Sequence, residues 1–155
     1  MRCSFQKVQL IDRKKFADAR GLHKGAYILA EAEDKQGKTA APKLILIATG
    51  SEVGLAMQAR EHLSSQNIPT RVVSMPCWEF FDEQTAKYKE SVLPKNVTAR
   101  MAIEAGVSLG WEKYIGMEGD TVTVDKFGTS APADDVFKEY GFTVENVVKK
   151  AKKLL

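Results

Sequence analysis

The sequence predicts a single α/β domain built on a five-stranded mixed sheet with helices on both faces. The chain has 155 residues, which suits one domain and leaves little room for two. Segments with the pattern of strands alternate with segments of helical pattern, an order typical of α/β folds. The run Leu44–Ala48 is apolar at every position without alternation, which indicates a strand covered on both faces, as in the middle of a parallel sheet.

The predicted strands and helices follow one another with short links. Five segments have the composition or alternation of strands: Ala26–Ala30, Lys43–Ala48, Arg71–Met75, Thr98–Glu104 and Thr121–Val124. Five others have the helical pattern: Ser51–Ser64, Asp82–Val92, Leu109–Ile115, Ser130–Tyr140 and a last helix that begins after Thr143. A strand, a helix and a second strand in succession form a βαβ unit, which is right-handed by strong preference.

Residues that favour helix ends flank several of these segments. Ser51 is a predicted N-cap, because its hydroxyl can accept a hydrogen bond from a free N–H of the first helical turn. Pro94 stops the helix before it, since the residue preceding a proline is driven away from helical geometry. Ser130 and Thr143 are the predicted N-caps of the last two helices.

Two features predict how the outer strands are placed. The link 31–42 contains no helical pattern and is short for a parallel crossover, so we predict that the first strand runs antiparallel to the others. The strand Thr121–Val124 alternates between polar and apolar residues, which means that one face is wetter and that the strand lies near a sheet edge. Residues 1–24 are basic and weakly patterned, and we expect a linker there, followed by one domain over residues 25–155.

Composition limits the functional classes. The net charge is +3, from 23 basic and 20 acidic side chains, and the two signs are interspersed, whereas nucleic-acid binders concentrate basic residues on one face. Cys3 and Cys77 have no metal-binding spacing, so we interpret them as free thiols of a reducing compartment. No apolar run is long enough for a membrane span, and the first residues lack the layout of a signal peptide. We expect a cytoplasmic protein that binds neither nucleic acid nor membrane.

The best candidate for a ligand site lies where the parallel strands end. Ligands of open α/β sheets bind in a crevice beyond the carboxyl ends of the strands. The residues expected around this crevice are Gly50, Ser51, Glu52, Glu104 and Gly106. Glu104 could form a carboxylate pair with Asp125 if their strands are neighbours. The single glycine of the first turn fits neither a dinucleotide-binding fingerprint nor a P-loop, so a tight turn with a capping serine is the simpler interpretation.

The other conspicuous residues have ordinary structural interpretations. His23 and His62 have no metal-spaced partner and no neighbouring nucleophile, so both are expected on the surface. Cys77 would need a cationic neighbour to form a reactive thiolate. The C-terminal segment carries lysines on one face and apolar residues on the other, and a surface helix explains this pattern better than membrane or partner binding. We predict no catalytic, cofactor-binding or metal-binding residue in this chain.

Several short motifs follow one another in a specific order. They are Ala48–Val53, Arg71–Pro76, Ser91–Pro94, Glu104–Gly106, Gly110–Tyr114, Asp125–Gly128, Ser130–Pro132 and Gly141–Val148. In this order, and over nearly all of residues 25–155, they resemble the C-terminal domain of transketolase. The resemblance implies a three-layer αβα fold with a mixed sheet whose first strand is antiparallel, in agreement with the prediction made from the residues.

The resemblance also implies an activity for a larger parent enzyme. The transketolase family transfers a two-carbon ketol unit from a ketose phosphate to an aldose phosphate, in the pentose phosphate pathway. It uses thiamine diphosphate and a divalent cation, Mg²⁺ or Ca²⁺, held between the N-terminal and middle domains of a homodimer. The family's Gly-Asp-Gly motif is absent here, since Gly119–Asp120 is followed by Thr121. The chain is therefore expected to be a non-catalytic domain, inactive alone, that supports the parent's structure and its dimer.

One residue departs from the family pattern. Ser4–Lys7 resembles the end of the preceding domain, where the family has Ser-Arg-Gln and the arginine holds substrate phosphate. Phe5 occupies that place here, and a phenyl ring cannot make a charge-assisted contact with phosphate. No substrate-binding residue is therefore carried over to this chain.

Two alternatives remain open at the level of sequence. One is a regulatory module that binds a small molecule in the strand-end crevice. The other is the equivalent domain of a related thiamine enzyme, such as deoxyxylulose phosphate synthase or the pyruvate dehydrogenase decarboxylase. The stretches Gly110–Tyr114 and Phe127–Pro132 favour transketolase itself.

Overall fold

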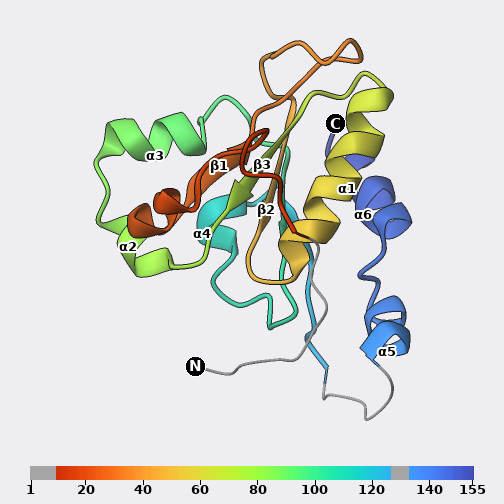
Figure 1. Ribbon diagram of the computed structural model, residues 1–155. Helices are drawn as coiled ribbons and strands as arrows, with labels where there is room; N and C mark the ends of the chain where they lie inside the picture. Colours follow the sequence, from red (N-terminus) through yellow and green to blue (C-terminus); the bar gives the residue numbers. More distant parts are fainter. Residues whose placement is uncertain (1–9, 127–132) are drawn as a thin grey trace.

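A five-stranded sheet lies between two layers of helices (Figure 1). The structure is a computed structural model and describes residues 10–126 and 133–155. The strands are β1 (Tyr27–Ala30), β2 (Leu44–Ala48), β3 (Thr70–Ser74), β4 (Arg100–Ile103) and β5 (Asp120–Val122). The helices are a 3₁₀ helix η1 (Ala19–Lys24), then α1 (Glu52–Ser65), α2 (Trp78–Asp82), α3 (Ala86–Val92), α4 (Glu112–Ile115), α5 (Ala133–Glu139) and α6 (Val144–Lys152).

The order of the strands across the sheet is β1-β3-β2-β4-β5. Strand β1 pairs antiparallel with β3, and the other neighbours are parallel. The predicted mixed sheet with an antiparallel first strand is therefore confirmed, and so is the position of β5 at an edge. The link 31–42 carries no helix and contains one isolated antiparallel bridge between Glu33 and Thr39.

Strand β2 lies at the centre of the sheet and is fully buried, as its apolar sequence predicts. Its side chains alternate between the two faces. Leu44, Leu46 and Ala48 belong to the core that packs under α1 and α6. Ile45 and Ile47 belong to a second core that packs under α2, α3 and α4. Both helix layers are thus held against the same strand.

Two arginines fasten the link between β1 and β2 to the rest of the domain. The side chain of Arg60 on α1 is 3% exposed, donates to the carbonyl of Glu31 and forms an ion pair with Glu33 at 2.9 Å. Arg71 on β3 pairs with the Glu31 carboxylate at 3.0 Å and donates to the carbonyl of Val92. These bonds fix the link to α1 and β3, in addition to the backbone hydrogen bonds that it makes within itself.

Some helix boundaries differ from the prediction. Ser51 is not a side-chain N-cap: its backbone is already helical, and its hydroxyl donates to the Glu52 carboxylate at 2.6 Å. The helix predicted over Asp82–Val92 is shorter: α3 begins at Ala86, where the hydroxyl of Thr85 accepts a hydrogen bond from the Tyr88 N–H and caps it, and Asp82 is the last residue of a separate helix, α2. Thr143 caps α6 as predicted. Ser130 lies outside the described residues.

Helix α6 is amphipathic, as expected for a surface helix. Val147, Val148 and Ala151 face the core. Among its lysines, Lys150 departs from the purely solvated face, since it pairs with Asp120 at 2.9 Å and so ties α6 to β5. None of the helices in the described parts of the chain combines the length and apolar character needed to cross a membrane.

Gly25 lies against the backbone of α2, and substituting it tests how closely the two segments are packed. It has φ 77°, and a Cβ there would overlap with the backbone of Phe81 and Cys77, whereas Gly37, at φ 76°, has open space around it. Left-handed backbone costs roughly 1–2 kcal/mol for an L-residue. We expect Gly37→Ala to lower the free energy of unfolding by about that amount, and Gly25→Ala by roughly 3 kcal/mol or more, in urea titrations followed by circular dichroism. Equal losses would show that the contact at Gly25 is easily relaxed.

Candidate functional site

A crevice of about 470 Å³ lies beyond the carboxyl ends of β2, β3 and β4, where the sequence predicted it. Its walls are mainly apolar, and its polar groups are few. The apolar lining comes from Met75, Pro76, Trp78, Val107, Leu109 and Trp111, and the polar side chains are Thr49, Cys77, Glu79 and Glu104. A mainly apolar pocket with a few convergent polar groups is the usual form of a ligand site.

Glu104 is positioned by the end of β4. Its N–H donates to the carbonyl of Val122 on β5 at 3.0 Å, and two residues later the carbonyl of Gly106 accepts from the Val124 N–H at 2.7 Å. The loop that lines the crevice is therefore held to the edge strand. A Cβ at Gly106 would lie 3.3 Å from the Glu104 side chain, so glycine leaves room for that carboxyl.

Two tryptophans form the rigid part of the crevice wall. Trp78 starts α2, and Trp111 precedes α4 and is 1% exposed. Their rings meet edge to face, with centroids 5.0 Å apart at 80°, a favourable geometry for aromatic pairs. Gly110 has φ 93°, and a Cβ there would lie 2.7 Å from the Trp78 ring, so this glycine allows the two indoles to approach.

The carboxyl of Glu104 is held in an unfavourable environment for its charge. Burial, and secondly the negative charge of Glu52, raise the pKa of Glu104 to about 7. Glu52, the first residue of α1, is 5% exposed. Two carboxyls from different elements thus lie at one edge of the sheet. With a pKa of about 7, the Glu104 carboxyl changes its protonation state near neutral pH.

The predicted site residues are only partly brought together. Glu104 and Gly106 line the crevice, and Glu52 lies close enough to influence Glu104. Gly50 and Ser51 are not among its lining residues, and Thr49 takes their place. The sequence missed Trp78 and Trp111, since a contact between rings so far apart in the chain leaves no local pattern.

Asp125 was considered as a partner for Glu104, but the carboxylate that acts on Glu104 belongs to Glu52. Asp125 is exposed and accepts hydrogen bonds from the Ser108 N–H at 2.8 Å and the Thr123 hydroxyl at 2.9 Å. These bonds, the backbone one first, lower the pKa of Asp125. Asp125 therefore serves to fix the loop.

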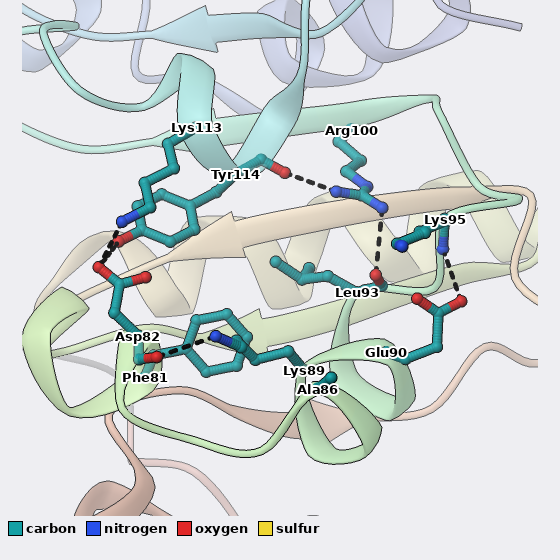
Figure 2. A pocket seen from close by; sticks show the side chains of 10 residues that line it. All are labelled: Phe81, Asp82, Ala86, Lys89, Glu90, Leu93, Lys95, Arg100, Lys113 and Tyr114. Carbon is teal, nitrogen blue, oxygen red and sulfur yellow. Dashed lines mark hydrogen bonds and ion pairs between the residues drawn. The ribbon is translucent and has the colours of Figure 1, made fainter.

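A second cavity, of about 660 Å³, lies between α2, α3 and α4, beside the first residue of β4 (Figure 2). It carries four basic residues, and the side chains of three of them, Lys89, Arg100 and Lys113, are bonded to the protein. Arg100 donates to the carbonyls of Val97, Tyr114, Leu93 and Pro94, and burial lowers its pKa. Four of the five N–H donors of this arginine are thus used within the protein, where they tie the start of β4 to α4.

Asp82 binds the other basic groups on the α2 side of this cavity. Its carboxylate pairs with Lys113 at 2.6 Å and accepts from the Tyr114 hydroxyl at 3.1 Å, while its carbonyl accepts from Lys89 at 2.9 Å (Figure 2). Burial, and secondly the charge of Asp82, raise the pKa of Tyr114. We interpret this cavity as a joint between helices.

The remaining candidates behave as surface residues. His23 and His62 are exposed, as predicted. The Cys77 thiol donates to the Glu79 carboxylate at 3.4 Å, so the charged group in contact with it is an acid and not the cation that the prediction required. Cys3 and Phe5 lie outside the described residues.

The described residues do not fit the thiamine diphosphate and divalent cation that the resemblance implies for the parent enzyme. Among them, no group of three or more histidine, cysteine, aspartate and glutamate side chains could hold a metal ion. At Gly119–Asp120, the nearest match to the diphosphate motif, the Asp120 carboxylate is bound to Lys150 and to the Thr121 N–H.

Residues 25–143 match the family described as the transketolase-like TK C-terminal domain. The chain belongs to this family. A transketolase from Geobacillus stearothermophilus is 51% identical over 135 residues, which are 87% of this chain and 20% of the relative. A transketolase from Streptococcus pyogenes serotype M6 is 52% identical over 150 residues, which are 96% of this chain and 20% of the relative. The chain thus spans about a fifth of the length of these transketolases.

Solved transketolase structures share the fold of this C-terminal domain. Transketolase from Leishmania mexicana superposes with a TM-score of 0.77 at 41% identity, covering 87% of this chain and 18% of that one. Transketolase from Pichia stipitis, in complex with sedoheptulose-7-phosphate, gives 0.78 at 34% identity, covering 90% and 19%. These matches confirm the predicted family and the three-layer αβα fold.

The raised pKa of Glu104 predicts a specific pH dependence of stability. The folded chain retains the Glu104 proton up to about pH 7, whereas the ordinary value is 4.5, so the folded state loses stability as the pH rises between these values. Glu104→Gln removes this loss. We expect the free energy of unfolding of the variant, relative to wild type, to rise by about 1–2 kcal/mol from pH 4.5 to pH 8, after allowance for solvent screening at a half-buried group.

Urea titrations at several pH values measure this difference. Glu61→Gln, at an exposed position on α1, is the matched control and should show a pH-independent difference. A flat profile for Glu104→Gln would mean that Glu104 titrates at an ordinary value.

Proposed function

We propose that this chain is the non-catalytic C-terminal domain of a transketolase, with a structural role in the parent enzyme and its dimer. The observation that carries this proposal is the family match over residues 25–143. Its support is the environment of the polar groups: within the described residues, the charged clusters at Asp82, Arg100 and Asp120 are bound to each other or to the backbone. Groups engaged in this way hold a fold together.

The activity of the parent is proposed from the same match. A parent transketolase would transfer a two-carbon ketol unit between sugar phosphates of the pentose phosphate pathway, in the cytoplasm. Thiamine diphosphate and Mg²⁺ or Ca²⁺ would be bound by the N-terminal and middle domains of a homodimer. The relatives are about five times as long as their aligned segment, which covers 20% of each, so they have ample length for such domains.

The proposed linker over residues 1–24 contributes to the domain beyond it. Ile11, Phe16 and Ala17 pack against the core beside α1, and the Ala17 N–H donates to the carbonyl of Leu29 at 3.0 Å. A connection that packs in this way would set the orientation of the domain toward the part of the parent that precedes it. We propose that the domain proper begins near Gly25.

The non-catalytic role predicts that the purified chain does not transfer ketol units. The measurement is a coupled assay with a ketose phosphate donor, an aldose phosphate acceptor, and saturating thiamine diphosphate and Mg²⁺. Full-length transketolase from Geobacillus stearothermophilus under the same conditions is the positive control. Turnover by the 155-residue chain above the no-enzyme rate would overturn the proposal.

The structural role predicts the effect of removing the domain from a parent. Deleting the aligned C-terminal segment from the Geobacillus stearothermophilus transketolase should weaken the dimer and lower its melting temperature, because apolar surface that the domain covers becomes exposed. Light scattering over a dilution series measures the dimer, and calorimetry the melting temperature. An unchanged dimer with full stability would count against the structural role.

A further inference from the structure

The strand-end crevice carries acidic groups and no basic ones. Its ionisable lining side chains are the carboxyls of Glu79 and Glu104 and the thiol of Cys77. A third carboxyl, that of Glu52, lies close enough to Glu104 to raise its pKa. The whole chain, in contrast, has a net charge of +3. The crevice is thus acidic, and its charge complements a cation.

The aromatic wall favours the same kind of ligand. The chain has two tryptophans, and both line the crevice. The faces of indole rings attract cations through the ring quadrupole, most strongly where water is excluded. Trp111 is 1% exposed, so the half-buried Trp78 is the ring that can contact an ion held at a carboxylate. A phosphate or carboxylate ligand would instead be repelled by Glu79 and Glu104.

The mouth of the crevice is apolar. Val107 and Leu109, both on the loop after β4, are 60% and 79% exposed, and both line the cavity. Single exposed apolar side chains are common, but two on one loop, at the rim of a pocket, provide a surface for the apolar part of a ligand. A bare metal ion or a small inorganic cation would leave this surface uncovered.

Glu104 lacks a partner for its charge. Among the described residues, no side chain donates a hydrogen bond to its carboxylate and no cationic side chain lies within ion-pair distance. The other half-buried and buried acids are bound: Glu52 accepts from Ser51, and Asp82 and Asp120 pair with lysines. The carboxylate of Glu104 is therefore available to a donor that enters the crevice.

We propose that this crevice binds an organic cation, an ammonium or guanidinium group on an apolar stem, with the charged end against Glu104 and the stem between Trp78 and Leu109. The volume of about 470 Å³ lies within the range of small-molecule sites, roughly 300–1,000 Å³. Two sources supply this chemistry: a free small cation, or a lysine or arginine side chain from another part of the parent polypeptide. The crevice and its acidic lining belong to this chain alone, so binding of a free cation is independent of the proposed function, whereas the second source rests on it.

The test uses the purified chain and two probes of the same shape. The probe n-butylguanidinium is charged, and n-butylurea is its neutral counterpart. Because both tryptophans line the crevice, tryptophan fluorescence and the two indole N–H signals in NMR report on this site. At pH 8 we expect saturable changes in both signals with n-butylguanidinium and no saturation with n-butylurea. Equal responses to the two probes, or no saturable response to the cation, would overturn the proposal.

The Glu104→Gln variant isolates the role of the carboxylate. It should weaken n-butylguanidinium binding roughly tenfold, the loss expected for one charge-assisted contact, while the Glu61→Gln control binds as wild type. Urea titration confirms that each variant is folded. Unchanged affinity in a folded Glu104→Gln chain would contradict the assignment.

Binding to wild type should also depend on pH in one direction. The groups that face Glu104 are Glu52 from α1 and Glu79 and Cys77 from the start of α2. Since the cation binds the ionised carboxylate and Glu104 retains its proton up to about pH 7, the affinity should fall as the pH drops through that value and level off about tenfold lower, near the affinity of the neutral Glu104→Gln variant. Glu104→Gln should remove most of this dependence. A pH-independent wild-type affinity would overturn the proposal even if the variant failed to fold.

A final arm separates the two sources. The domain is exchanged into full-length Geobacillus stearothermophilus transketolase, and the probe titration is repeated by NMR with labelled tryptophan. Retained binding identifies a free cation as the ligand. Loss of binding, together with a lower melting temperature of the Glu104→Gln chimera, identifies a side chain of the same polypeptide. Loss of binding with an unchanged melting temperature would contradict both sources.

Discussion

The burial of β2 on both faces is the constraint on which the rest of the structure depends. All five of its side chains have no exposed surface, so each face of this strand needs its own layer of helices. The two apolar cores meet only through the sheet, and β2 contributes to both. Because β3 and β4 flank β2 in parallel, their carboxyl ends arrive at one edge. The crevice beyond that edge follows from this central strand.

The parts of the fold that depend on local patterns could be predicted from the sequence. The antiparallel β1 followed from a link too short for a crossover, and the edge position of β5 followed from its alternation. The separate helix α2 could not be predicted in this way, because its five residues, Trp78–Asp82, are too few to show a helical apolar period. Thr85 accepts the Tyr88 N–H, and Phe81 packs in the second core, so tertiary contacts decide where one helix ends and the next begins.

The position of the candidate site was predicted from the sequence, but most of its lining residues were not. The general rule for open α/β sheets placed it at the strand ends, and Glu104 and Gly106 lie there. The partner of Glu104 was sought on β5, the neighbouring strand, whereas the start of α1 brings Glu52 close instead. The position of the α1 N-terminus relative to β4, the fourth element after it in the chain, depends on the packing of the whole layer. The same is true of Trp78 and Trp111, whose contact depends on the left-handed backbone of Gly110 and on the core beneath the rings.

The two ends of the sheet differ in how their charges are used, and this difference separates the roles of the two cavities. Beside the first residue of β4, Arg100 donates to backbone carbonyls and Lys113 forms an ion pair with Asp82. These charged groups therefore hold the helices together. At the carboxyl end of the strands, burial disfavours the negative charge of Glu104, and no described side chain compensates that charge. A domain with a purely internal structural role would gain stability by replacing such a group with a neutral one. The unfavourable carboxyl is therefore best explained by a contact that the isolated chain does not make, with a cationic group that this acidic, tryptophan-lined edge can accept.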